Sequence, residues 1–377
     1  MNNIPPVDLA LQYKTIEAEI NAAVLSVLAS GRYIGGNPVE SFEQQFAFYT
    51  GVKSCIACNS GTDALYLALR SLGIGAQDQV ITTPFTFIAT AEAISAVGAT
   101  PIFVDINPET FNLDLNQLEK AITPKTKAIL PVHLFGQPVD MTRLMAVANT
   151  HNLFVIEDCA QATGAEWAGR KVGSIGHIGC FSFFPTKNLG AMGDGGAVTT
   201  NDNALATQIR RLREHGTSSR YYHEATGINS RLDALQAAIV QIKLRYLDKW
   251  NAQRSEIASR YGDFLSPIPG IILPKAPNGS KSVWNQYTIR VTGTEDEENR
   301  DKVRSQMQEK GVTSMVYYPL PLHLQPVYQS LGYNSGSFPI VEQACREVLS
   351  LPIFPELSIE QQEQVVYALK ESIVNSH

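Results

Sequence analysis

The chain has 377 residues, of which 44% are hydrophobic and 18% charged, and its formal net charge at pH 7 is −6. This length allows one large domain and a smaller one, each with its own core. The negative charge argues against nucleic acid and anionic membranes as partners. No apolar run approaches the length of a membrane span, and residues 1–8 lack the charged and apolar parts of a signal peptide, so we expect a cytoplasmic protein.

Residues 41–201 alternate between strand-like apolar runs and helix-like segments. Strands are predicted at 53–58, 79–82, 100–105, 128–132, 153–157, 178–183 and 196–199, and helices at 62–71, 90–97, 116–121 and 141–150. This alternation predicts a mostly parallel sheet of about seven strands with helices on both faces. The expected fold class is α/β.

Residues 231–265 carry apolar side chains at helical spacing, which predicts one long amphipathic helix, or two in tandem, bridging two domains. A smaller α/β unit is expected after it, with strands at 287–291 and 312–317 and helices at 299–310, 340–349 and 359–372. We therefore predict a large domain with an N-terminal arm over residues 1–245, and a small C-terminal domain over residues 246–377.

The cysteines and histidines suggest neither disulfides nor a metal site. The chain has five cysteines, an odd number, which argues for reduced thiols. Cys55 and Cys58 form a single CxxC motif inside a predicted buried strand, and no second CxxC or nearby histidine supplies further zinc ligands. We interpret the pair as core residues and expect no metal.

One lysine lies in apolar, glycine-rich surroundings. The segment GCFSFFPTKNLG, residues 179–190, places Lys187 next to three phenylalanines. Most lysines are solvated surface charges, but burial here would lower the pKa of the ammonium and make Lys187 a usable amine nucleophile. An aldehyde cofactor would capture such an amine.

The four apolar residues LFVI (153–156) run into the carboxylates of Glu157 and Asp158. Asp158 follows this predicted buried strand, and ligands of parallel sheets bind at the carboxyl ends of the strands. There it can pair with the ring nitrogen of pyridoxal phosphate, keep that nitrogen protonated and so sustain an electron sink. By itself Asp158 could equally cap a helix or bind a metal. Together with Lys187 it indicates pyridoxal phosphate chemistry.

Four motifs then resemble one family. NSGTDAL (59–65), EDCAQ (157–161), SFFPTKNLG followed by GDGG (182–196) and GINSRLDALQAAI (227–239) closely resemble the sugar-nucleotide aminotransferases of the DegT/DnrJ/EryC1/StrS family, and they occur in that family's order. The resemblance covers about residues 6–369. It implies a pyridoxal 5'-phosphate enzyme of the fold-type I aminotransferases, with a seven-stranded large domain. Sugar dehydratases of the family carry a histidine where this chain has Lys187.

Candidate phosphate ligands come from two segments. Gly61 and Thr62 open a predicted helix, and a helix N-terminus favours anions. The alternative is that Ser60 merely caps this helix. The resemblance favours phosphate binding and implies that Ser182 makes a second phosphate contact. It also implies that Phe87 stacks on the cofactor ring, with Phe85 as the core alternative, and that Gln161 donates to the ring hydroxyl oxygen.

Further residues are implied by the resemblance alone. Asn229 would reach the cofactor phosphate of a neighbouring subunit, where Arg231 would approach the substrate, although a polar loop of this kind is usually just surface. The enzyme would then be a homodimer with shared active sites. Tyr317, Tyr318 and His323 match the segment that lines the sugar and diphosphate pocket, while the two tyrosines could instead be packing residues.

The expected activity is transfer of an amino group from an amino acid, with glutamate expected as donor, to a nucleoside-diphosphate-linked 3- or 4-keto sugar, for amino-sugar or polysaccharide biosynthesis. Lys187 would hold the cofactor and act as general base and acid. Two alternatives stay open. One is a pyridoxal phosphate dehydratase or lyase, against which Lys187 argues. The other is a regulator that binds pyridoxal phosphate or a nucleotide sugar without turnover.

Overall fold

A seven-stranded sheet forms the centre of the computed structural model, which describes residues 3–292 and 299–374. The strand order is β1-β9-β8-β5-β4-β2-β3, and β9 is antiparallel to both neighbours while the pairings from β8 to β3 are parallel. The strands are β1 (Ser54–Cys58), β2 (Gln79–Thr82), β3 (Thr100–Phe103), β4 (Thr126–Ile129), β5 (Phe154–Asp158), β8 (Ile178–Ser182) and β9 (Gly196–Thr200). The seven predicted strands and the α/β fold class are confirmed.

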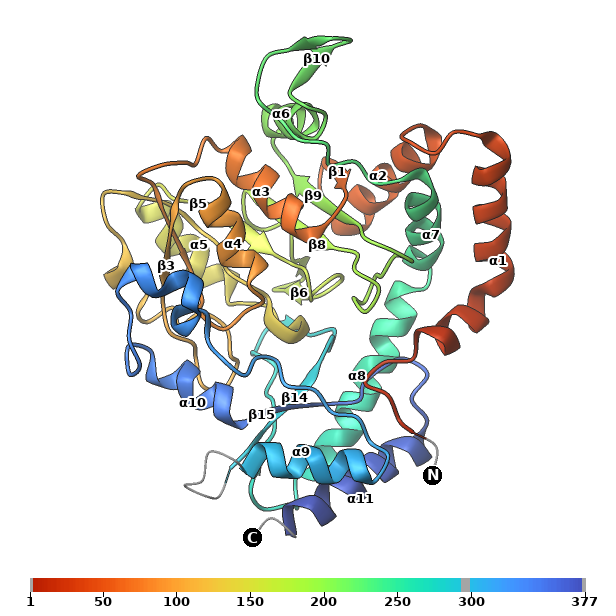
Figure 1. Ribbon diagram of the computed structural model, residues 1–377, viewed down its shortest axis with the longest axis vertical. Coiled ribbons are helices and arrows are strands. Elements are labelled where there is room, and N and C mark those ends of the chain that lie inside the picture. The colour runs from red at the N-terminus through yellow and green to blue at the C-terminus, as the bar shows by residue number, and fades with distance from the viewer. Residues whose placement is uncertain (1–2, 293–298, 375–377) are drawn as a thin grey trace.

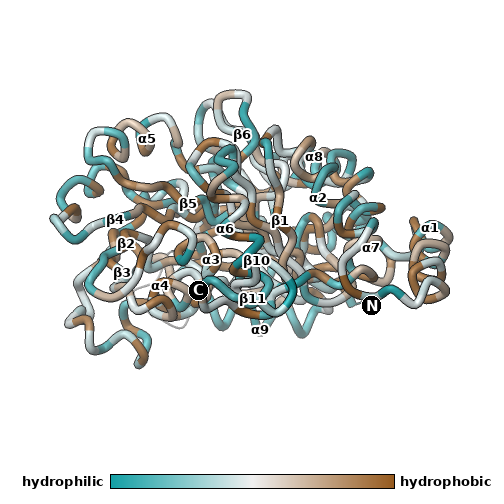
Figure 2. Tube along the Cα trace, turned by 90° about the horizontal axis from the view of Figure 1, so that it is seen from above, coloured by the Kyte–Doolittle hydropathy of each residue, from teal (hydrophilic) through white to brown (hydrophobic). Residues whose placement is uncertain are grey.

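Helices cover both faces of this sheet (Figure 1), and hydrophobic strands lie between them (Figure 2). One face packs against α3 (Gly61–Ser71), α4 (Ala89–Ala96) and α6 (Asn203–Arg213). The other packs against α2 (Asn37–Thr50), α5 (Met141–Thr150) and α7 (Ala234–Leu244).

The CxxC motif is divided between these two faces. Side chains alternate along β1, so Cys58 packs with α3 while Cys55 packs with α2. Two thiols on opposite faces of one strand cannot share a metal ion or form a disulfide. All five cysteines are free and buried, and the interpretation of Cys55 and Cys58 as core residues is confirmed.

The predicted long helix is two helices in tandem, α7 and α8 (Leu247–Leu265). The proposed division at residue 245 falls between them. Beyond it, a small antiparallel sheet of order β12-β14-β15 packs with α8 and the last two long helices of the chain (Figure 1). These elements are β12 (Ile271–Ile272), β14 (Tyr287–Val291), β15 (Val348–Leu351), α9 (Asn299–Glu309) and α11 (Ile359–Val374).

Three predicted elements need correction. The prediction of a strand at 312–317 is wrong, because this segment makes only single bridges at Val312 and Met315. The helix expected at 340–349 is α10 (Pro339–Glu347), and its last residues belong instead to β15. The segment 116–121 contains a 3₁₀ turn, η1 (Leu118–Ala121), in place of an α-helix.

The N-terminal arm was not predicted as helical. Helix α1 (Leu9–Ser30) begins where the Asp8 carboxylate accepts the Leu11 N–H at 2.8 Å and ends at Gly31, whose φ of 64° suits glycine. It packs on α7 and stands at one side of the molecule (Figure 1). Ile4, which precedes α1, is buried in the core of the C-terminal unit, so the arm joins the two units.

Small elements complete the described chain. A three-stranded sheet consists of β13 (Ser280–Lys281), β6 (Glu166–Trp167) and β7 (Arg170–Lys171), and a hairpin of β10 (Thr217–Ser219) and β11 (Tyr222–His223) projects beyond α6 (Figure 1). Two short turns, η3 (Leu322–Leu324) and η4 (Pro326–Leu331), precede α10. Among the helices in residues 3–292 and 299–374, none has both the length and the apolar character that crossing a membrane requires.

The C-terminal unit is tied to the large sheet through α10. The Asp105 carboxylate, just after β3, accepts the backbone N–H groups of Ile340 and Val341 at 3.0 Å each and so caps this helix. Val341 packs in one core with Phe85 and Phe135 of the large unit. The segment at 317–323 is thereby held over the loop that follows β2, where the Leu322 N–H donates to the Pro84 carbonyl at 2.9 Å.

Candidate active site

The carboxyl ends of β5 and β8 meet at one edge of the sheet. The two strands are parallel neighbours, with Asp158 opposite Cys180. Because side chains alternate, Asp158 shares a face with Ile156, and Ser182 shares it with Cys180; both partners pack with α3. Asp158 and Ser182 therefore lie on the α3 side of the sheet, at the edge where parallel sheets bind ligands.

A cradle of close backbone contacts surrounds the start of α3. A Cβ on Gly61 would lie 2.7 Å from Ser182 Cβ, and a Cβ on Gly196 would lie 2.3 Å from the Ser60 carbonyl oxygen, so only glycine fits. The Ser60 hydroxyl caps the helix by accepting the Asp63 N–H at 3.1 Å. Since the first N–H groups of a helix have no partner within it, those of Gly61 and Thr62 can still bind an anion.

Lys187 extends from a tight loop after β8. Its backbone N–H donates to the Phe184 carbonyl at 2.9 Å, and a Cβ on Gly190 would lie 2.2 Å from the Pro185 carbonyl oxygen. Desolvation lowers the pKa of the Lys187 ammonium, and the nearby Asp158 carboxylate partly opposes this effect. The amine expected from the sequence is thus present beside a carboxylate.

The next residue anchors this loop. The Asn188 side-chain NH2 donates to Asn251 Oδ1 at 2.7 Å and to the Val283 carbonyl at 2.9 Å, and Asn188 Oδ1 accepts from Asn285 Nδ2 at 2.8 Å. All of these groups are buried or nearly so. The loop that carries Lys187 is therefore held by groups from two distant segments, at Asn251 and at residues 283–285.

Asp158 is buried and held by two donors. Its Oδ1 accepts the Ala160 N–H at 3.1 Å, and its Oδ2 accepts the Thr90 hydroxyl at 2.9 Å. Burial raises the pKa of the carboxyl, while the hydrogen bonds from Ala160 and Thr90 and the charge of Lys187 oppose that rise. Both oxygens keep a lone pair for one more donor, as a ring N–H would require.

The amide of Gln161 has a defined orientation. Its Oε1 accepts the Phe135 backbone N–H at 2.6 Å, which only an oxygen can do, and its Nε2 donates to the Tyr318 hydroxyl at 3.2 Å. The second hydrogen on Nε2 is left for another acceptor. This orientation suits the donor role expected of Gln161. Burial raises the pKa of the Tyr318 hydroxyl, so this group stays protonated.

Phe85 and Phe87 have different environments. Phe85 is fully buried and contacts Phe135 and Tyr318 edge-on, at ring-centroid distances of 6.1 Å each. Phe87 is 57% exposed, in the same loop after β2. Phe85 is a core residue, and Phe87 is the aromatic ring of the two that is free to stack on a ligand.

The predicted substrate residues divide into two groups. Tyr317 and Tyr318 are half-buried beside Phe85. His323 does not belong with them, because its side chain is fully buried, its Nε2 lies 3.0 Å from Glu342 Oε1 and its ring packs on Phe338. The structure therefore places His323 in the interior and not, as expected, beside the two tyrosines.

Asn229 and Arg231 lie close to the start of α3 in their own chain. The Arg231 Nε–H donates to Asn229 Oδ1 at 3.0 Å, and between them the Ser230 hydroxyl donates to Asn59 Oδ1 at 3.2 Å. Asn229 is exposed, and both residues line a cavity of about 420 Å³ together with Asp194. Their side chains are available at the surface near the cradle.

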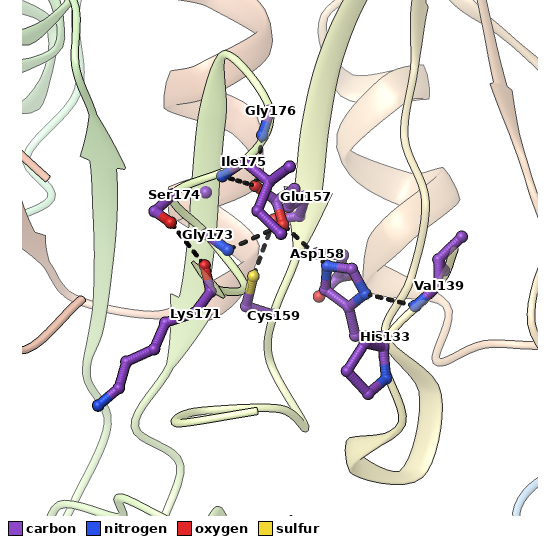
Figure 3. A network of polar contacts seen from close by, with 12 residues as sticks. His133, Val139, Glu157, Asp158, Cys159, Lys171, Gly173, Ser174, Ile175 and Gly176 are labelled. Atoms are coloured by element: carbon purple, nitrogen blue, oxygen red, sulfur yellow. Dashed lines mark hydrogen bonds and ion pairs between the residues drawn. The ribbon is translucent and has the colours of Figure 1, made fainter. Parts of the chain in front are cut away.

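One buried network was missed by the sequence interpretation (Figure 3). The Glu157 carboxylate, on the face opposite Asp158, accepts the N–H groups of Gly173, Ile175 and Gly176 at 2.6–2.8 Å and lies 3.0 Å from His133 Nε2. Burial raises the pKa of Glu157, but these hydrogen bonds bring it below its usual value. The sequence signal for this network was Glu157 itself, because a charged residue in a buried strand needs hydrogen-bond partners.

The atoms of His133, Glu157 and Cys159 are near enough to hold a metal, but they are already engaged. His133 Nδ1 accepts the Val139 N–H at 3.0 Å, so Nε2 carries the ring proton and donates it to Glu157. Burial keeps the Cys159 thiol protonated by raising its pKa. The network instead anchors the turn at 173–176 that leads into β8.

This sheet, with a lysine and an aspartate at its carboxyl edge, is the architecture of the fold-type I aminotransferases, and the comparisons with known proteins agree. The model described as the DegT/DnrJ/EryC1/StrS aminotransferase family matches residues 14–370. The chain belongs to this family and is an aminotransferase.

Similar proteins include two curated relatives. A "Pleiotropic regulatory protein" of Geobacillus stearothermophilus is 48% identical over 98% of both chains. A "dTDP-3-amino-3,4,6-trideoxy-alpha-D-glucose transaminase" of Streptomyces venezuelae is 45% identical, covering 98% of this chain and 96% of the relative. The relatives thus include a protein named as a regulator and one named as an enzyme.

Two solved structures are also similar. S. venezuelae DesV in complex with a ketimine intermediate has a TM-score of 0.95 at 45% identity, over 98% of both chains. The structure of ntda from Bacillus subtilis "with bound cofactor pmp" has a TM-score of 0.91 at 34% identity, over 99% of this chain and 86% of the other.

Proposed function

We propose that this aminotransferase uses pyridoxal 5'-phosphate to move an amino group from an amino acid, glutamate, to a keto sugar linked to a nucleoside diphosphate. The observation that carries the proposal is that Lys187, Asp158 and the cradle formed by Gly61 and Ser182 lie together on one face of the sheet. The name of the S. venezuelae transaminase supports the sugar class, and the cofactor named for ntda supports the cofactor.

The residues at this edge fit the cofactor. When bound, pyridoxal phosphate would supply an electron sink for carbanion chemistry. The Lys187 amine, with its lowered pKa, would hold the aldehyde carbon and then move a proton as base and acid. Asp158 would accept the ring N–H, and the Gly61 and Thr62 N–H groups with the Ser182 hydroxyl would bind the phosphate.

The remaining residues would complete the site. Phe87 would cover the ring, and the free Nε2 hydrogen of Gln161 would donate to the ring oxygen. Tyr317 and Tyr318 would contact the sugar or the diphosphate. All of these groups lie near the carboxyl edge of the sheet or on the segment held over it.

Two alternative functions make different predictions. A dehydratase or lyase would lack amino transfer, and the presence of Lys187 argues against it. A non-catalytic regulator is suggested by the name of the Geobacillus relative. The desolvated Lys187 amine beside the buried Asp158 carboxylate favours an enzyme, because a binding protein has no need of a desolvated nucleophile.

A two-step assay tests the proposal. The purified chain with pyridoxal phosphate is mixed with L-glutamate, and we expect the near-visible absorbance to shift to that of pyridoxamine phosphate with release of one 2-oxoglutarate per site. Adding a dTDP- or UDP-linked 3-keto sugar should restore the absorbance and yield an amino sugar. Dehydrated sugar in place of amino sugar would support the lyase, and absence of both half-reactions would support the regulator.

We also propose that the enzyme is a homodimer in which Asn229 and Arg231 serve the neighbouring subunit, Asn229 at the cofactor phosphate and Arg231 at the substrate. The exposure of Asn229 beside the start of α3 supports this. A Lys187→Ala chain and an Asn229→Ala, Arg231→Ala chain should each be inactive. After random subunit exchange, activity should return to about one quarter of wild type, because half of the dimers are mixed and each has one complete site.

The exchange experiment has a built-in control. Mixing each defective chain with itself should restore nothing, and heterodimers are verified by differently sized affinity tags. If verified heterodimers are as inactive as the parents, Asn229 and Arg231 act within their own chain or not at all.

We further propose a cytoplasmic enzyme, in keeping with five free, buried cysteines.

A further inference from the structure

Two buried threonines form a chain of hydroxyl groups that ends at Asp158. Thr90, at the start of α4, lies 2.9 Å from Asp158 Oδ2, and Thr86, one helical turn earlier in the same segment, lies 2.9 Å from the Thr90 hydroxyl. The two side chains are 1% and 4% exposed. Water therefore has little access to these hydroxyl groups, and their hydrogen bonds are made with each other and with the carboxylate.

The direction of these two hydrogen bonds follows from counting the donors and acceptors that each group offers. An ionised carboxylate can only accept, so the single hydroxyl hydrogen of Thr90 points to Asp158. The Thr90 oxygen is then the acceptor, and Thr86 is the donor to it. Each bond polarises the next, which strengthens the hydrogen bond that reaches the carboxylate. The Ala160 N–H on Oδ1 and the Thr90 hydroxyl on Oδ2 together fix the orientation of the carboxylate, and with it the directions open to a further donor.

We propose that Thr90, supported by Thr86, is a positioning residue that keeps Asp158 ionised and fixes the plane of its carboxylate for the ring nitrogen of the cofactor. This inference rests on the proposed function for its role in catalysis, but the threonine–aspartate interaction itself does not. A carboxylate that loses its donors becomes more basic and takes the ring proton for itself. The electron sink then weakens although the cofactor stays bound.

Other groups also act on this carboxylate. The Lys187 ammonium favours its ionised form, and Tyr318 and Cys180 lie near it as groups that remain protonated because burial raises their pKa values. His133 and the protonated Cys159 thiol lie with Glu157 on the other side of the strand. Glu157 points to the opposite face of β5, where its own donors stabilise its ionised form. A change caused by Thr90 must therefore be measured with these groups left in place.

The test uses Thr90→Val, which removes the hydroxyl at nearly constant volume, and Thr90→Ser, which restores it. Thr82→Val is the matched control, because Thr82 is equally buried in β2 and its hydroxyl donates to the Leu130 carbonyl at 2.8 Å, away from Asp158. The cofactor-free chain, labelled with ¹³C at aspartate carboxyls, is titrated by NMR, and Asp158→Asn assigns the signal.

We expect Thr90→Val to raise the Asp158 pKa by about one unit or more, the size expected for a hydrogen bond to a charged group. Thr90→Ser and Thr82→Val should leave this pKa near the wild-type value. In the enzyme reconstituted with pyridoxal phosphate, Thr90→Val should slow the glutamate half-reaction about 10- to 100-fold, with the apparent glutamate affinity nearly unchanged. Thr90→Ser should recover most of that loss.

An unshifted Asp158 titration in folded Thr90→Val would overturn the inference, as would equal effects of Thr90→Val and Thr82→Val. If Thr90→Val does not fold, as judged by circular dichroism, Thr86→Val replaces it, and its titration should move in the same direction by a smaller amount. A wild-type chain that fails to transaminate would refute the proposed function, whereas the titration of the cofactor-free chain would still decide whether Thr90 controls Asp158.

Discussion

Replacing Lys187 with alanine is expected to lower turnover by more than about 1000-fold, equivalent to about 4 kcal/mol in the activation barrier. The amine is the nucleophile that would hold the cofactor and the base that would move the proton, and its pKa is lowered by desolvation for that purpose. The near-visible absorbance of the lysine-bound cofactor should disappear. Absorbance spectra and single-turnover rates with glutamate measure both effects.

The fold should survive this substitution, because the Lys187 side chain is only half-buried and its loop is anchored through Asn188. Thermal unfolding checks this. Lys171→Ala is the matched control: its ammonium lies over the Tyr49 ring, 3.6 Å from the centroid, outside the site, and its loss should leave the spectrum unchanged. Substantial turnover by Lys187→Ala would exclude the proposed mechanism.

Asp158→Asn is expected to slow the half-reaction with glutamate by at least about 100-fold, or about 2.7 kcal/mol. The amide carries no charge to hold a proton on the ring nitrogen, so the electron sink is lost. The cofactor should still bind through the phosphate cradle at Gly61 and Ser182. Stopped-flow absorbance gives the rate, and equilibrium titration gives the cofactor affinity.

Asparagine should be tolerated by the fold, since the Thr90 hydroxyl can rotate to accept from the new NH2 group while Oδ1 keeps the Ala160 N–H. Glu157→Gln provides the contrast on the opposite face. Its NH2 group would replace one of the two oxygens and so meet either the Gly173 N–H or the Gly176 N–H, and we expect a loss of about 2–5 kcal/mol in stability. A near-wild-type rate in Asp158→Asn would make Asp158 a structural residue.

Local sequence patterns predicted the large sheet well. Strands such as β2 and β8 are apolar runs bounded by turn residues, and each can be recognised without knowing its neighbours. Asp158 and Lys187 were recognisable for the same reason, because Asp158 follows a buried strand at the end where ligands bind and Lys187 is the one charged residue of an apolar segment.

Elements that depend on distant partners were missed. The segment 312–317 has the composition of a strand, yet it finds only single bridging partners in Ile4 and Ser350. His323 lies in a motif that resembles a substrate segment, but Glu342 and Phe338 hold it in the interior. Helix α1 packs mainly on α7, more than 200 residues later in the sequence.

The sequence by itself determined the fold class, the family and the amine–carboxylate pair, because these follow from periodicity and from motifs of a few adjacent residues. Only the tertiary structure decided which hydrogen-bond donors reach each carboxylate. Asp158 and Glu157 are neighbours in one strand, yet the pleat sends one to Thr90 and the other to His133. Their environments depend on contacts between distant segments, which no local pattern contains.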